Sequence, residues 1–193
     1  MRHIRQDLPQ GTVVIMDLNQ RIRTAKIIRE AEGYLELGLP QQAVNTLSRL
    51  GEPEQFGPEV LYLWGESLRA LERYAEAIPP LERAAKSAPK DIRVRLALGW
   101  CCKRIGRLDR AIQALKEALS LEPNEALLYY NLACYLCLSG QKHDALLHLA
   151  KALTLDSAYR EAAKQEEDFE QLRNDPVFQN LCAGKKPRRP ARP

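Results

Sequence analysis

Residues 92–125 read IRVRLALGWCCKRIGRLDRAIQALKEALSLEPNE, and their spacing of small and apolar side chains recurs at intervals of 34 residues. Within this segment Ala111, Leu115 and Ala118 follow the 3.6-residue period of a helix. A repeat of this length made of helical segments predicts a stack of helix pairs. Five columns recur over four copies: Ala31, Gly65, Gly99 and Ala133; Ala43, Ala77, Ala111 and Ala145; Leu47, Leu81, Leu115 and Leu149; Leu50, Ala84, Ala118 and Ala152; Tyr34, Leu68, Cys102 and Leu136.

Each copy contains two predicted helices joined by a tight turn. In the third copy the first helix is expected to end at Ile105, and Gly106 suits the left-handed conformation that ends a helix. Gly38 and Gly140 occupy the same place in the first and fourth copies, whereas Glu72 replaces glycine in the second. Glycine or alanine where the paired helices cross lets their axes approach to about 8–10 Å.

Two stretches resemble the tetratricopeptide repeat (TPR): WGESLRALERYAEAI at 64–78, followed by Pro89, and GWCCKRIGRLDRAI at 99–112, followed by Pro123. The resemblance implies an all-α fold, a right-handed superhelical solenoid of helix-turn-helix repeats with a C-terminal capping helix. Many bacterial TPR proteins end with a segment similar to DFEQLRNDPVFQNL (168–181), which favours a bacterial source. Four repeats are expected within 18–157, at 24–57, 58–91, 92–125 and 126–157.

The two ends of the chain depart from the repeat. Residues 1–17 are expected to form a flexible arm, with Asp17 and Gln20 capping a helix that begins at Leu18. Residues 183–193 are expected to be a disordered basic tail, because they carry five cations and no acid.

The segment 158–182 predicts a cap that covers the apolar end of the array. Asp175 suits the N-cap of a short helix and Pro176 its first turn. Glu166, Glu167 and Asp168 are expected to form a solvated acidic face. The covering side chains are expected to be Phe169, Leu172, Phe178 and Leu181.

The composition is that of a soluble folded protein, with 45% apolar and 28% charged residues and a formal net charge of +4. Before residue 183 the chain has 24 basic and 25 acidic residues, so the body is close to neutral. No stretch is long enough to span a bilayer, and five cysteines without framework spacing suit a reducing compartment. A cytoplasmic location is therefore expected.

The resemblance implies that the first helices of the repeats line a concave groove in which a partner binds. An alternative for Tyr62 and Tyr130 is that they pack against the neighbouring repeat. Leu96 and Leu127 occupy outward positions of the same helices. The partner-binding residues expected in the groove are Glu32, Glu36, Tyr62, Glu66, Arg69, Arg93, Trp100, Lys103, Arg104, Tyr130 and Asn131.

These features predict an interaction scaffold or adaptor that holds a peptide or helix of another protein. One subclass of TPR proteins binds the acidic C-termini of chaperones, and this subclass is disfavoured. Among the positions that correspond to its carboxylate-binding residues, only Arg93 has the required charge, and Glu32 would repel a carboxylate. The alternative is an adaptor for RNA, DNA or an anionic surface, which would use the basic tail and the basic third repeat.

Catalytic, cofactor and metal sites are not expected. His143 and His148 lack an aligned nucleophile or acid, and no glycine-rich phosphate loop occurs. Cys134 and Cys137 share a helical face near Cys101 and Cys102, but one CxxC inside a helix lacks the paired spacing of a zinc site. Small buried residues are the preferred interpretation of these cysteines.

Overall fold

The computed structural model describes residues 18–51 and 56–184. The expected flexible arm with Asp17, and residues 185–193 of the basic tail, lie outside the described residues. Every regular element within the described ranges is helical, so the predicted all-α solenoid is confirmed. The elements are α1 (Leu18–Glu36), α2 (Pro40–Leu47), η1 (Ser48–Leu50), α3 (Pro58–Ala70), α4 (Tyr74–Ser87), α5 (Ile92–Arg104), α6 (Leu108–Leu121), α7 (Ala126–Leu138), α8 (Lys142–Leu155), α9 (Tyr159–Gln165), η3 (Glu167–Leu172) and α10 (Pro176–Cys182).

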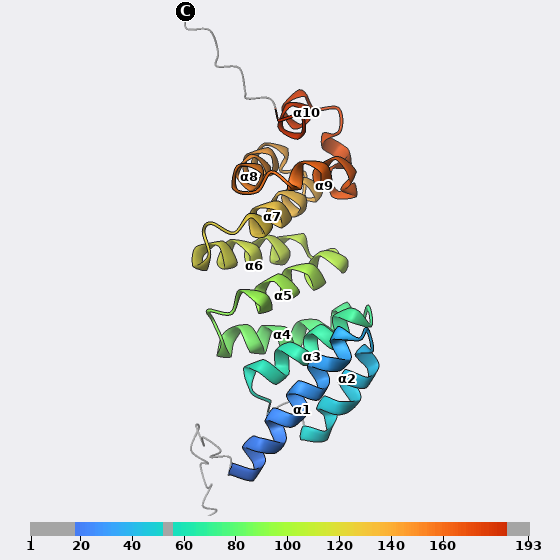
Figure 1. Cartoon of the computed structure of the whole chain (residues 1–193). Helices are drawn as coiled ribbons and strands as arrows, with labels where there is room; N and C mark the ends of the chain where they lie inside the picture. Colours follow the sequence, from blue (N-terminus) through green and yellow to red (C-terminus); the bar gives the residue numbers. More distant parts are fainter. Residues whose placement is uncertain (1–17, 52–55, 185–193) are drawn as a thin grey trace, which may run out of the picture.

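The helices form consecutive antiparallel pairs that stack along one direction, with α1 and α2 at one end and α10 at the other (Figure 1). Each second helix contacts its partner within the pair and the first helix of the next pair, and α3 also contacts the first helices α1 and α5. Among the described residues, no helix combines the length and the apolar character that a bilayer crossing requires.

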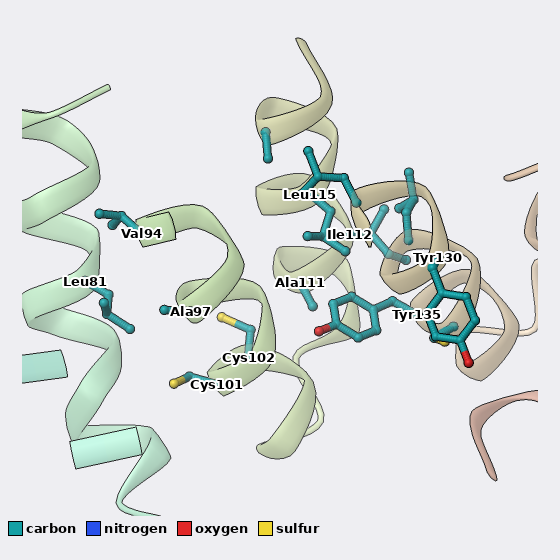
Figure 2. Close-up of a cluster of buried hydrophobic side chains, with 14 of the residues drawn as sticks. Leu81, Val94, Ala97, Cys101, Cys102, Ala111, Ile112, Leu115, Tyr130 and Tyr135 are labelled. Atoms are coloured by element: carbon teal, nitrogen blue, oxygen red, sulfur yellow. The ribbon is translucent and has the colours of Figure 1, made fainter. Parts of the chain in front are cut away.

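The recurring small residues lie where the helices of a pair cross. Ala111 of α6 is fully buried beside α5, and Leu115 one turn later is also fully buried. In Figure 2 the side chains of α4, α5, α6 and α7 meet in one continuous apolar layer. The columns of Ala31, Ala43 and Leu47 are buried in all four pairs, so the core runs along the whole array.

The turns inside three pairs use glycine in the left-handed region, as the sequence predicts. Gly38, Gly106 and Gly140 have φ of 69°, 76° and 79°. Glu72, at the equivalent position between α3 and α4, has φ of 59°. The N–H of Arg73 still donates to the carbonyl of Leu68 at 2.9 Å, so this turn keeps the hydrogen bond of a glycine C-cap despite the side chain.

Acidic side chains cap the starts of α5, α7 and α10. Asp91 accepts a hydrogen bond from the backbone N–H of Arg93 at the start of α5, and Glu125 does the same at the start of α7. Asp175 accepts from the backbone N–H groups of Val177 and Phe178, and Pro176 occupies the first turn of α10, as predicted.

The glycines at the helix crossings make a matched pair for testing this packing. A Cβ on Gly65 would lie 2.5 Å from Cγ of Leu81, which is fully buried, whereas a Cβ on Gly99 would meet its nearest neighbour at 3.5 Å. We expect Gly65→Ala to lower the free energy of unfolding by about 1–3 kcal/mol through overpacking. We expect Gly99→Ala to leave it unchanged or raise it by about 0.5–1 kcal/mol. Urea unfolding followed by circular dichroism measures both, and equal effects at the two sites would contradict this packing.

The left-handed glutamate gives a second test. A non-glycine residue in this region costs about 1–2 kcal/mol, so Glu72→Gly should raise the midpoint of thermal unfolding. Gly106→Ala should lower the midpoint, because it introduces the same strain into the next turn. A lower midpoint for Glu72→Gly would show that the side chain, and not the backbone, sets the stability of that turn.

Candidate functional site

Side chains of α3, α5 and α7 line an open hollow of about 280 Å³. Stacking of the pairs brings these first helices together, since α3 contacts both α1 and α5. The hollow is lined by Tyr62, Glu66, Arg69, Arg93, Leu96, Ala97, Trp100, Leu127, Asn131 and Tyr135.

The apolar part of the hollow consists of large side chains that remain accessible. Trp100 is 39% exposed and Leu127 is 37% exposed, which is high for residues of this size in a packed array. Leu96 lies half-buried beside them, and Ala97 is buried. The hollow therefore offers an apolar surface to a side chain from outside.

The arginines that line the hollow are already paired with carboxylates. Arg69 donates two hydrogen bonds to Glu66, both of 2.8 Å, and these bonds raise the pKa of Arg69. Arg93 donates to Asp91 at 3.0 and 2.7 Å, and its hydrogen bonds lower the pKa of that carboxyl. The guanidinium carbon of Arg93 also lies 4.9 Å from the ring centroid of Tyr62. The charges on these walls are thus balanced locally.

Lys103 does not stand free in the hollow. Its Nζ lies 2.5 Å from an Oδ atom of Asp168, with side-chain exposures of 18% and 11%. The rings of Trp100 and Tyr135 lie 5.5 and 5.9 Å from the same nitrogen. The interpretation of Asp168 as part of a solvated face is therefore wrong, because η3 folds onto α7 and carries this carboxylate to α5.

Tyr130 is not on the open surface either. It is 6% exposed, its ring stacks on Tyr159 at 4.7 Å, and it meets the edge of Phe169 at 5.8 Å. This arrangement agrees with the packing alternative for Tyr130, because the cap covers the inner face of α7 at this point. Phe169 and Leu172 of the cap are fully buried.

The remaining expected residues divide between the hollow and other surfaces. The guanidinium of Arg104 lies 5.1 Å from the ring of Tyr74 at the start of α4, outside the hollow. Glu32 and Glu36 lie on α1, beyond the hollow. The expected residues that do line it are Tyr62, Glu66, Arg69, Arg93, Trp100 and Asn131.

Sequence reasoning did not place Tyr135 in this site. Tyr135 is 2% exposed and closes the hollow beneath Lys103. Its position one helical turn after Asn131 was the available signal, since residues four apart share a helix face.

The cysteines are buried free thiols. Cys101, Cys102, Cys134, Cys137 and Cys182 are all buried. Burial raises the pKa of Cys101 to about 12 and also raises the pKa of Cys134. Over the ranges that the structure describes, no three His, Cys, Asp or Glu side chains are grouped to hold a metal ion.

Comparison with known proteins identifies the repeat. A family profile described as "Tetratricopeptide repeat" matches residues 68–133, from the last residues of α3 into α7. Residues 68–133 are tetratricopeptide repeats, and the described helices around them continue the same fold. No curated protein matches the chain by sequence.

Solved structures share the TPR fold over more of the chain. YrrB, described as a TPR protein with an unusual peptide-binding site, matches with a TM-score of 0.61 at 24% identity, over 66% of this chain and 66% of YrrB. MamA from Desulfovibrio magneticus RS-1 matches with a TM-score of 0.70 at 21% identity, over 87% and 92% of the two chains. MamA MSR-1 matches with a TM-score of 0.68 at 22% identity, over 86% and 95%. The TPR fold is in general that of a protein-interaction scaffold.

The buried thiols of this TPR array give a test of the cap. A thiol reacts with a disulfide reagent as its thiolate, and burial with a raised pKa suppresses that form. We expect the native protein to react with DTNB near neutral pH far more slowly than the same protein in urea. Rapid native labelling of Cys182, located by mass spectrometry, would show instead that the cap opens readily.

Proposed function

We propose that this TPR protein binds a peptide or a helix of a partner protein in the hollow between α3, α5 and α7. The observation that carries the proposal is the accessible apolar surface of Trp100 and Leu127 inside a hollow whose charges are balanced. Such a surface suits an apolar or aromatic anchor side chain, because burying it releases water without stranding a charge.

The rim of the hollow offers groups that orient a chain. The side-chain amide of Asn131 has no hydrogen-bond partner within the described residues, so it can both donate to and accept from a peptide backbone. The guanidinium of Arg93 lies over the ring of Tyr62 at 4.9 Å and forms one wall of the hollow. The likeness to YrrB, a TPR protein with a peptide-binding site, agrees with this role at the level of the fold.

The cap restricts the direction in which a bound peptide can extend from the hollow. The pair of Lys103 with Asp168, and the packing of Phe169 on Tyr130, occupy the inner face of α7 beyond the hollow. A bound peptide therefore extends from Trp100 toward α3 and α1, away from the cap.

The alternative of nucleic-acid or anionic-surface binding is less favoured. Arg93 and Lys103 of the basic third repeat are paired with Asp91 and Asp168, which reduces the charge that they offer to a phosphate. The cations that remain for this alternative are exposed residues such as Arg104 and Arg107, together with those of residues 185–193, which lie outside the described residues.

The proposal is tested by truncating the exposed tryptophan. Short random peptides displayed on phage would be selected on the full chain, and affinities of the enriched peptides measured by fluorescence anisotropy. Trp100→Ala should weaken binding at least about tenfold, as a central aromatic anchor does. It should leave the thermal midpoint nearly unchanged, because Trp100 is partly solvated already.

The matched control is Leu147→Ala, which removes an apolar side chain of α8 that is 55% exposed and does not line the hollow. This variant should bind as the parent does. If Trp100→Ala retained full affinity, the partner surface would lie elsewhere on the molecule.

A further inference from the structure

We infer that the partner peptide carries basic residues on the side of its apolar anchor that points toward α1. This inference rests on the proposed function, and it assigns a chemical class to the ligand of the same hollow. It follows from the carboxylates of α1 and α3, which lie where the bound chain leaves the hollow.

Three of these carboxylates are uncompensated. Within the part of the chain that the structure describes, Glu32, Glu36 and Glu59 have no cation in hydrogen-bond or ion-pair contact. Arg21, Lys26 and Arg29 also lie on α1 but toward its N-terminal end, so the excess of negative charge is confined to the last two turns of this helix and to Glu59. Uncompensated carboxylates beside a binding hollow attract a cationic ligand and disfavour an acidic one.

Their placement follows from the packing of α1 on α3. Ile28 and Leu35 are partly buried against the core, and Glu32 lies between them at helical spacing, half-buried on the same face. Because α1 contacts α3, this face continues the inner surface of α3.

Glu59 connects this acidic surface to the hollow. It stands three residues before Tyr62 on α3, so both occupy one side of the helix. The pKa of Arg93 is raised chiefly by its hydrogen bonds to Asp91 and also by the field of Glu59, which places that carboxylate near the wall of the hollow. Glu59 thus lies at the edge of the hollow, and Glu32 and Glu36 lie on the adjacent helix α1.

An acidic peptide finds no equivalent surface here. The cations nearest the hollow, Arg69, Arg93 and Lys103, are each engaged by a carboxylate of this chain. A ligand carboxylate would have to displace one of these partners, which would leave that partner buried or unpaired. Lysine or arginine in the ligand needs no such displacement.

The experiment uses displayed random peptides selected on the full chain and depleted on Trp100→Ala, so that the retained peptides require the hollow. We expect the retained peptides to combine an apolar or aromatic anchor with an excess of lysine and arginine on one side of it. One such peptide would be synthesised together with a version in which glutamine replaces its basic residues.

The triple variant Glu32→Gln, Glu36→Gln and Glu59→Gln should bind the basic peptide about fivefold more weakly at low ionic strength, with a flatter salt dependence. It should bind the glutamine version as the parent does. The control triple variant Asp109→Asn, Glu122→Gln and Glu167→Gln changes the net charge equally at exposed sites outside the hollow, and it should bind both peptides normally.

The outcomes separate the two claims. Peptides that require Trp100 but are neutral or acidic would overturn the inference and leave the proposed function standing. Unchanged affinity of the Glu32, Glu36 and Glu59 variant for the basic peptide would do the same. Failure to retain any Trp100-dependent peptide would overturn both.

Discussion

Helices α3 and α4 approach so closely at Gly65 that a single added methyl carbon would lie 2.5 Å from Leu81. The small residues recurring at the equivalent crossings allow each helix pair to close over a core of leucines. Pairs closed in this way stack with their first helices side by side, and that arrangement alone creates the inner surface. The hollow around Trp100 therefore depends on the close approach of the paired helices at these crossings, which lie outside the hollow itself.

The sequence predicted those parts of the structure that depend on local chemistry. The repeat spacing, the left-handed glycines and the N-cap at Asp175 each follow from what one residue and its near neighbours can adopt. It left two interpretations of Tyr130 open and did not predict the pairing of Lys103 with Asp168, because these environments depend on where the cap folds back. Lys103 and Asp168 are 65 residues apart, and no period in the sequence links them. Arg95 is a second residue whose environment the repeat spacing does not predict. It fills a position held by Leu61 one repeat earlier, yet it is buried, with Glu117 at 3.5 Å as its partner.

The structure changes the interpretation of the charged groove residues, because it shows which of them form ion pairs within the chain. From sequence, Arg93, Lys103 and Arg104 predict a basic middle section of the groove. In the structure Arg93 and Lys103 are paired with carboxylates of the same chain, and Arg104 lies against the ring of Tyr74 outside the hollow. What remains accessible in the hollow is aromatic and aliphatic surface. Selectivity by charge is then left to the glutamates of α1 and α3, whereas affinity comes from the apolar hollow.

The contact between Lys103 and Asp168 has a consequence for cooperativity. In a solenoid each repeat interacts only with its neighbours, so stability is close to a sum of local terms. This ion pair joins α5 to η3 and bypasses the fourth repeat, so it couples two parts of the array that are not neighbours in the stack. The ion pair of Arg110 with Glu82 adds a link between α6 and α4. A ligand seated across α3, α5 and α7 would add contacts among three successive pairs, so its binding energy would also oppose local opening of the array.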